Sequence, residues 1–203
     1  MALDLLIKNG TIIDGTGGLR YDADLGISGG KIEAIGNLED AQAGRVIDAS
    51  GLIITPGFID MHSHSDMSLF DDPGGESKAF QGVTTEVTGN CSYSAFPIAS
   101  NRKGDLGLGS FDWPVDWEWT DLDGYAGALE SHGISLNIAP QVGQAAIQIA
   151  VGANEERSVT EDEMRAMQRL AVEAIEQGAW SLSTGLSVAP SGYMSTDEVV
   201  ELM

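Results

Sequence analysis

The fold of this chain is decided by one stretch, Gly57-Phe58-Ile59-Asp60-Met61-His62-Ser63-His64-Ser65-Asp66. An apolar run leads into it, and the two together predict a buried strand over residues 52–60. Residues two apart on a strand point to the same face, so the side chains of His62 and His64 should project together from its carboxyl end. Such a pair of neutral imidazoles suits Zn, Fe, Ni or Cu. The alternative is a pair of surface histidines in a loop.

The composition is that of a globular protein. Of the 203 residues, 42% are hydrophobic and 20% are charged, and this length allows one domain or a little more. No apolar run approaches the roughly 20 residues that span a bilayer. The start of the chain lacks the basic region of a secretory signal. We therefore expect a cytoplasmic protein.

The charge balance excludes two classes of partner. The formal net charge is −21, from 31 acidic against 10 basic residues. A polyanion of this density is repelled by nucleic acid and by anionic membrane surfaces. The acidic residues are dispersed rather than gathered into a tail, so we interpret them as a solvated surface.

Residues 1–55 are predicted to form an all-β domain of short strands joined by turns. Asn9-Gly10 is a strong hairpin signal, and Ser28-Gly29-Gly30 predicts a second hairpin. Short apolar strands around residues 46–48 and 52–54 follow.

From residue 56 to residue 203 the pattern changes to strand followed by helix, which predicts parallel strands with right-handed crossovers. The predicted strands span 52–60, 83–88, 134–139 and 179–183, and the predicted helices span 76–81, 122–132 and 161–177, with another opening at Ser195. Capping boxes at Thr160-x-x-Glu163 and at Ser195-x-x-Glu198 mark the starts of the last two helices, and Thr120 is the expected N-cap of the helix over 122–132. A closed (β/α)8 TIM barrel needs about 250 residues. We therefore expect an α/β fold, a partial barrel of about four βα units that forms the N-terminal portion of a longer enzyme. The alternative is a complete small α/β domain.

The only cysteine, Cys91, cannot form an intrachain disulfide, which leaves a buried apolar role, a reactive thiol or a metal ligand. It follows the second predicted strand, as His62 and His64 follow the first. In an α/β barrel the chemistry sits at the carboxyl ends of the strands. Neighbouring strands lie about 5 Å apart, so these side chains can reach one ion, and a thiolate can bridge two.

Other polar residues around this edge carry weaker predictions. Asp66 is interpreted as an outer ligand or as a group that orients a histidine, with a helix cap or surface acid as the alternative. Asn90 could hold the Cys91 loop or touch substrate, although a turn-forming role is favoured. His132 ends a predicted helix, where an imidazolium pairs with the helix dipole, so we leave it out of the site. The long irregular segment 92–119 is typical of a lid or binding surface, and its tryptophans are expected to serve mainly in packing.

The motifs resemble the amidohydrolase superfamily and, within it, the D-aminoacylase (N-acyl-D-amino-acid deacylase) group. The resemblance rests on residues 57–66, on Gly-Val-Thr-Thr-Glu-Val-Thr-Gly-Asn-Cys at 82–91, and on Gly-Ala-Trp-Ser-Leu-Ser-Thr-Gly-Leu at 178–186. Asn90-Cys91 is the narrower mark, because most superfamily members use a carboxylated lysine as the bridging ligand. The resemblance covers the whole chain, and it implies that the N-terminal segment is part of a small β-sandwich beside the barrel.

This resemblance implies zinc-assisted amide hydrolysis, with one or two ions held by His62, His64 and Cys91. It also implies two further histidines and a general-base aspartate from later strands, past Met203, so no catalytic residue is assigned within this chain. The implied partner is a small N-acyl amino acid or related amide. The 203-residue piece alone is expected to be inactive and to expose unpaired strand edges.

Three positions depart from the family pattern. Ser92 stands where a glycine is usual, Gln144 and its neighbours replace a Val-Gly-His-Gly-Thr run with an arginine beyond it, and Val188 replaces a tyrosine. The last two changes bear on polar contacts with the substrate. Two other functions therefore stay open: a hydantoinase-like or dihydroorotase-like hydrolase of cyclic amides, and a catalytically silent barrel fragment.

Overall fold

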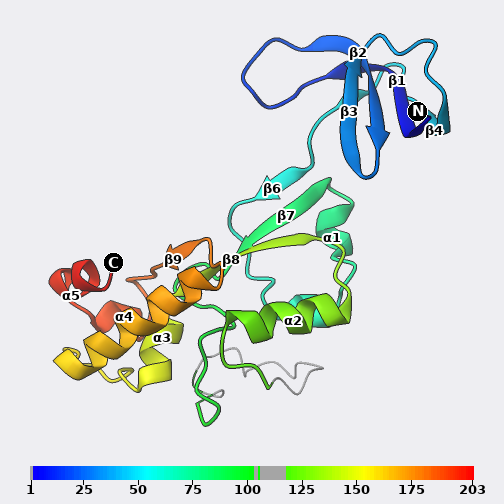
Figure 1. The fold of residues 1–203 in the computed structure, drawn as a ribbon. Helices are drawn as coiled ribbons and strands as arrows, with labels where there is room; N and C mark the ends of the chain where they lie inside the picture. Colours follow the sequence, from blue (N-terminus) through cyan, green and yellow to red (C-terminus); the bar gives the residue numbers. More distant parts are fainter. Residues whose placement is uncertain (1, 103–104, 106–117) are drawn as a thin grey trace. The chain divides into compact units, whose positions relative to one another are not determined.

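The computed structural model describes residues 2–102, 105 and 118–203 (Figure 1). The chain divides into two compact units, Met1–Gly57 and Phe58–Met203, which we describe one at a time. The predicted domains, 1–55 and 56–203, stay a proposal, because compactness does not show that either part folds alone. Within the described ranges, no helix combines the length and apolar character needed to cross a membrane.

The first unit is a mixed β-sheet. Its strands are β1 (Leu3–Ile12), β2 (Tyr21–Ser28), β3 (Lys31–Gly36), β4 (Ala43–Asp48) and β5 (Ile53–Ile54). They lie in the order β3-β2-β1-β4, and β5 also pairs with β1. β1 is antiparallel to β2 but parallel to β4 and β5. The prediction of an all-β segment is confirmed.

The predicted hairpin at Asn9-Gly10 is wrong, because β1 runs straight through these residues. The register against β2 shifts between Ile7 and Gly10, and Asn9 has a φ of 62°. The left-handed residue therefore forms a β-bulge rather than a chain reversal. Two carboxylates hold it there: the Asn9 backbone N–H donates to Asp24 (2.9 Å), and its side-chain amide donates to Asp48 (3.0 Å).

The hairpin predicted at Ser28-Gly29-Gly30 is confirmed. Gly29 and Gly30 have φ angles of 58° and 73°, the left-handed conformation that a two-residue hairpin loop requires. They join the antiparallel strands β2 and β3, in which Ser28 lies opposite Lys31.

The second unit is built on a parallel sheet of four strands in sequential order. They are β6 (Phe58–Asp60), β7 (Val83–Thr88), β8 (Asn137–Gly143) and β9 (Ser181–Ser183), ordered β6-β7-β8-β9. Each neighbouring pair is parallel. This arrangement confirms the predicted partial (β/α) barrel.

The single buried strand predicted over residues 52–60 is wrong in two ways. Pro56-Gly57 separates β5, which joins the mixed sheet, from β6, which joins the parallel sheet, since proline cannot donate to a ladder. The side chains of Phe58 and Ile59 are also 56% and 59% exposed. β6 lies at one edge of its sheet and pairs only with β7 among the described strands, so little covers these residues.

The third predicted strand, 134–139, begins and ends several residues before the observed strand β8. β8 instead continues through Pro140 to Gly143, and its last residues pair with β9. A proline normally argues against a central strand. Here the carbonyl of Pro140 still accepts from the backbone N–H of Trp180 (2.7 Å), so the proline removes only the donor.

Five α-helices and two 3-10 turns accompany this sheet in the described chain. They are α1 (Glu76–Ala79), α2 (Leu122–His132), α3 (Gln144–Val151), α4 (Glu161–Glu176), α5 (Thr196–Leu202), η1 (Ser68–Phe70) and η4 (Ser191–Tyr193). The predicted capping boxes of α4 and α5 are both present, with Thr160 and Ser195 as the N-caps. The cap of α2 is Asp121, which accepts from Gly124, rather than the predicted Thr120.

The core of this unit lies where α2, α3 and α4 pack along one side of the sheet (Figure 1). Its largest fully buried apolar side chains include Tyr125, Phe96, Met67, Ile147 and Met167. At about 25 cal/mol per Å² of apolar surface removed from water, such side chains supply most of the stabilisation. The helices therefore fix the sheet from one side, while the loops after the strands carry the polar residues.

Candidate metal centre

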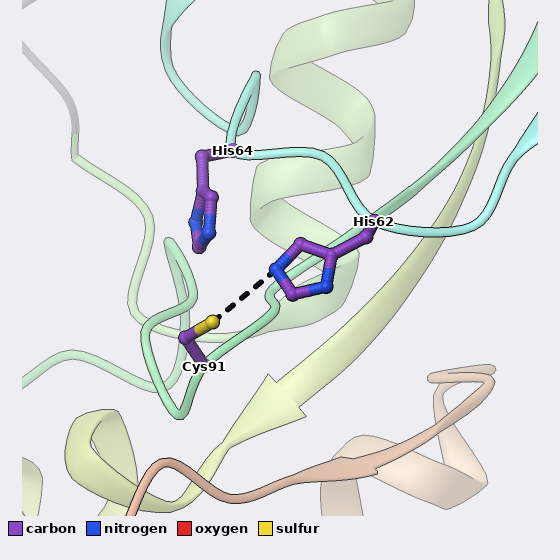
Figure 2. A group of neighbouring side chains, drawn as sticks. All are labelled: His62, His64 and Cys91. Atoms are coloured by element: carbon purple, nitrogen blue, oxygen red, sulfur yellow. Dashed lines mark hydrogen bonds between the residues drawn. The ribbon is translucent and has the colours of Figure 1, made fainter. Parts of the chain in front are cut away.

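The structure brings His62, His64 and Cys91 together at the carboxyl ends of β6 and β7 (Figure 2). One donor atom from each residue lies within 4.8 Å of the others. The Sγ atom of Cys91 is 3.2 Å from Nε2 of His62, and the two imidazole rings lie 5.3 Å apart at 63°. Both histidines are exposed and Cys91 is half-buried, so an ion can reach the group in the described chain.

The donor set fits a zinc-like divalent ion. Zinc binds nitrogen at about 2.0–2.1 Å and sulfur at about 2.3 Å, so two such ligands of one ion are at most about 4.4 Å apart. The His62–Cys91 pair already satisfies that limit. Partial desolvation, and secondarily the neighbouring His62, lowers the pKa of His64. The imidazole of His64 is therefore neutral over a wider pH range, which is the form that binds a metal.

Cys91 sits in an unusual stretch of backbone. Cys91 and Ser92 have φ angles of 54° and 72°, a left-handed conformation that costs a non-glycine residue about 1–3 kcal/mol. The carbonyl of Ser92 accepts from the N–H of Ala145 (2.9 Å), and its own N–H donates to Oγ of Ser183 (3.2 Å). Contacts with the first turn of α3 and with the end of β9 thus hold the conformation.

Two glycines allow this close packing. A Cβ atom at Gly143 would lie 2.1 Å from the carbonyl oxygen of Ser92, and one at Gly185 would lie 2.4 Å from that of Cys91. Real Cβ atoms do not come this close to backbone oxygen. The loop therefore rests directly on the backbones beside it, and the direction of the Cys91 side chain is fixed by the chain around it.

Asn90 links the two ligand-bearing segments. Its buried side-chain amide donates to the carbonyl oxygens of Ser63 (3.1 Å) and Val87 (2.7 Å). The structure thus shows Asn90 in the first of its predicted roles. Its side chain holds the Cys91 loop against Ser63, the residue between the two histidines.

Asp66 is buried, with 4% of its surface exposed, so the interpretation as a surface acid is wrong. Desolvation raises its pKa to about 7, opposed by a hydrogen bond from the backbone of Gly89. Its Oδ1 atom has no hydrogen-bond partner within the described residues. Asp66 is not part of the donor group, and a role as an outer ligand stays a proposal.

The other residues considered from sequence lie elsewhere. The ring of His132 packs 5.6 Å from that of Phe70, outside the donor group. Trp119 is buried and stacks on Phe70 at 5.3 Å, as expected for a packing residue. Trp113 and Trp117 lie outside the described residues.

The glutamines that depart from the family pattern are interior residues in the described chain. Gln144 and Gln148 are 0% and 1% exposed. The Gln144 amide donates to Gln148 (3.2 Å) and to the carbonyl of Ser191 (3.3 Å), and Gln148 donates to that of Pro190 (3.3 Å). These hydrogen bonds join α3 to the segment that contains η4. Val188, the third position that departs from the family pattern, is 37% exposed.

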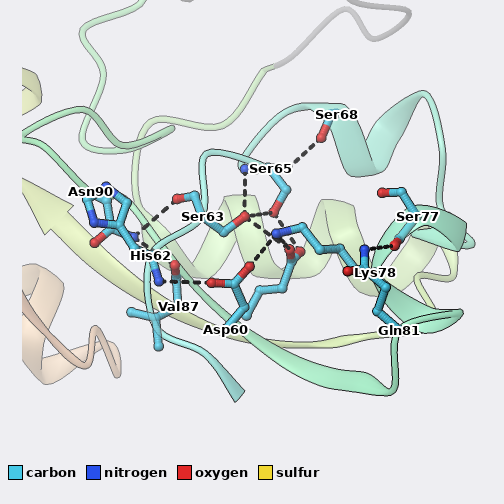
Figure 3. A network of polar contacts seen from close by, with 11 residues as sticks. Asp60, His62, Ser63, Ser65, Ser68, Ser77, Lys78, Gln81, Val87 and Asn90 are labelled. Atoms are coloured by element: carbon cyan, nitrogen blue, oxygen red, sulfur yellow. Dashed lines mark hydrogen bonds and ion pairs between the residues drawn. The ribbon is translucent and has the colours of Figure 1, made fainter. Parts of the chain in front are cut away.

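Sequence reasoning missed a charged cluster behind the histidines (Figure 3). Glu86 on β7 is fully buried and lies 3.3 Å from Nζ of Lys78, which also forms an ion pair with Asp60. The signal was present, because an acid in the middle of the β-branched run 83–88 is unusual in a buried strand. Its partner on α1 could not be identified from spacing alone.

Comparison with known proteins agrees with this geometry. A model of the amidohydrolase family matches residues 45–198. The chain is 41% identical over 199 residues to the N-acyl-D-glutamate deacylase of Alcaligenes xylosoxydans xylosoxydans, covering 97% of this chain and 40% of the relative. The D-aminoacylase of the same organism is 40% identical over 200 residues, covering 98% and 41%. The chain thus spans about two fifths of the length of these curated relatives.

A solved structure extends the similarity to three dimensions. The N-acyl-D-glutamate deacylase of Bordetella bronchiseptica, complexed with zinc and a phosphonate that mimics the tetrahedral intermediate, superposes with a TM-score of 0.89 at 38% identity. The match covers 100% of this chain and 42% of the other. The resemblance read from the motifs is therefore confirmed, and the chain belongs to the amidohydrolase family.

Proposed function

We propose that the protein is a metal-dependent amidohydrolase that removes the acyl group from N-acyl-D-amino acids. The observation that carries this proposal is the convergence of His62, His64 and Cys91 on one small volume. The identity of the chain to a deacylase, sustained over almost its whole length, supports the substrate class. The bond broken is a carbon–nitrogen bond outside the peptide backbone.

His62, His64 and Cys91 would hold one or two divalent ions, with zinc as the expected metal. A bound divalent ion supplies Lewis-acid polarisation of the amide carbonyl and activation of water for attack. The chain's own residues set the geometry: the loop of Cys91 is fixed by backbone contacts, and Asn90 aligns it with the histidine segment. The lowered pKa of His64 keeps its imidazole available as a ligand.

The general base is not assigned to any described residue. We propose that an aspartate and two further histidines, supplied by sequence outside these 203 residues, complete the centre. The shared length of about two fifths with the curated relatives is consistent with that division. It follows that the 203-residue piece alone should show no turnover.

The test is to purify the full-length protein that carries this chain and to measure bound metal together with amine release from N-acetyl-D-glutamate and other N-acetyl-D-amino acids. We expect tightly bound zinc, turnover of at least one D-isomer, and loss of both in a His62→Ala variant. Hydantoin and dihydroorotate serve as competing substrates. Turnover of these cyclic amides alone would overturn the substrate class, and unchanged hydrolysis in His62→Ala would overturn the metal centre.

A further inference from the structure

The segment that carries both histidines is tied from beneath by one buried carboxylate. Oε1 of Glu86 accepts from the hydroxyl of Ser63 (3.0 Å), and Oε2 accepts from that of Ser65 (2.6 Å). Ser63 lies between the two histidines, and Ser65 follows the second. One side chain therefore holds the histidine segment at two points two residues apart.

A second tether reaches the same segment through Lys78. Its ammonium group lies 3.3 Å from Oε1 of Glu86 and pairs with the carboxylate of Asp60, which in turn accepts from the backbone N–H of His62 (3.2 Å). Figure 3 shows Lys78 between Asp60 and the two serines. The chain of contacts thus reaches from α1 to the backbone of the first histidine.

The cost of this cluster argues that it does more than stabilise the fold. Glu86 is 0% exposed, whereas the side chain of Lys78 is 31% exposed. Burying a carboxylate loses hydration that the attraction to its partner often fails to recover, so such a group is a weak contributor to stability. An apolar residue on β7 would fill the same space. What the carboxylate adds is direction, because each oxygen accepts a hydrogen bond from a different hydroxyl of the histidine segment.

We propose that Glu86 and Lys78 are positioning residues, which fix the segment from Asp60 to Ser65 so that His62 and His64 face Cys91 before a metal arrives. This inference rests on the proposed function, since it assigns the tethers to the same metal centre. Hydrogen-bonded groups behind metal ligands typically contribute 10–100-fold to metal affinity. The tethers should therefore affect zinc binding more than folding.

The test uses the double variant Ser63→Ala/Ser65→Ala, which removes both hydroxyls and leaves the Glu86–Lys78 ion pair in place. Zinc affinity of the full-length protein is measured by competition with a chromophoric chelator, and the thermal midpoint is measured in excess EDTA. We expect affinity to fall about 10–100-fold. The metal-free midpoint should also fall, because the buried carboxylate of Glu86 loses two hydrogen-bond donors, but the protein should stay folded at the temperature of the affinity measurement. The Co²⁺-substituted protein should also show a changed thiolate-to-metal absorption band.

Two further variants make the test specific. Ser77→Ala is the matched control, because Ser77 is exposed on α1 beside Lys78, and its zinc affinity should equal that of the wild type. Ser65→Thr keeps the hydroxyl and should retain zinc affinity that Ser65→Ala loses. A purely structural role would not change zinc affinity between two variants that are both folded in the absence of metal.

The outcomes separate the two proposals. Wild-type zinc affinity in Ser63→Ala/Ser65→Ala would overturn the positioning inference and leave the metal centre standing. A loss of affinity that is explained by the metal-free variant being unfolded at the assay temperature would also overturn it, as a structural role alone. A wild-type protein that binds no zinc would overturn the metal centre and the positioning role together.

Discussion

The two segments that meet at the candidate metal centre are held in different ways. The loop of Cys91 rests on neighbouring backbones through glycine contacts, as at Gly143. The segment with His62 and His64 is held by side chains, chiefly Glu86, Lys78 and Asn90. The difference teaches that one ligand is positioned by the path of the chain and the other two by a polar network. Mutations should therefore affect the two segments with different severity.

The largest effect should come from adding one methyl group beneath the Cys91 loop. In Gly143→Ala the new Cβ would meet the Ser92 carbonyl oxygen at 2.1 Å, so either the loop or β8 must move. We expect a loss of about 3 kcal/mol or more in the free energy of unfolding, comparable to other severe packing errors. Chemical denaturation measures it.

Gly127→Ala is the matched control for that variant. Gly127 is exposed on α2, and a Cβ there meets nothing within 4 Å. The higher helix propensity of alanine should stabilise this variant by up to about 1 kcal/mol. Equal effects of the two substitutions would show that the close contact at Gly143 relaxes at little cost.

Removing the thiol should weaken metal binding more than removing any tether. We expect Cys91→Ala to lower zinc affinity more than about 100-fold. Loss of a metal ligand should cost more affinity than loss of a residue that only hydrogen-bonds to a ligand, which costs about 10–100-fold. Competition with a chelator measures the affinity. An affinity within about threefold of the wild type would place the sulfur outside the coordination sphere.

A smaller effect, and of opposite sign, is expected at Ser92. Its φ of 72° suits glycine, and its Oγ atom is buried with no partner in the described chain. Ser92→Gly removes both penalties, so it should raise the free energy of unfolding by about 1 kcal/mol. If Ser92→Gly were less stable than the wild type in thermal or chemical unfolding, the hydroxyl of Ser92 would have a stabilising partner, such as a water molecule.

The smallest effect should come from an ion pair on the surface, which contrasts with the pair between the buried Glu86 and the half-buried Lys78. Arg157, with Thr160 as a secondary cause, lowers the pKa of Glu163 to about 2. The stability that this carboxylate contributes is present in full above about pH 4.5 and is lost as pH falls toward 2. An exposed pair is worth less than about 1 kcal/mol.

In Arg157→Met we therefore expect a slightly lower thermal midpoint at pH 7 and a smaller further loss between pH 4.5 and pH 2 than in the wild type. Melting curves across that pH range measure both quantities. A loss at pH 7 as large as that of Gly143→Ala would contradict the distinction between surface pairs and packed contacts.

Local signals in the sequence located most of the elements correctly. The capping boxes that begin at Thr160 and Ser195 marked the starts of α4 and α5, because a cap is satisfied within one turn. The run 83–88 matched β7 without adjustment. The errors at Asn9-Gly10 and Pro140 share one cause: each residue's usual local preference was overridden by a neighbouring strand.

The sequence by itself determined the donor types and their order, since an imidazole pair and a thiol after successive strands predict a common edge. Only the tertiary structure decided how those donors are held. The pairing of Glu86 with Lys78 and the contact of Gly143 with Ser92 join residues that no periodic pattern relates. Such contacts depend on how β7, β8 and α1 pack, and packing is a property of the folded chain rather than of any short segment.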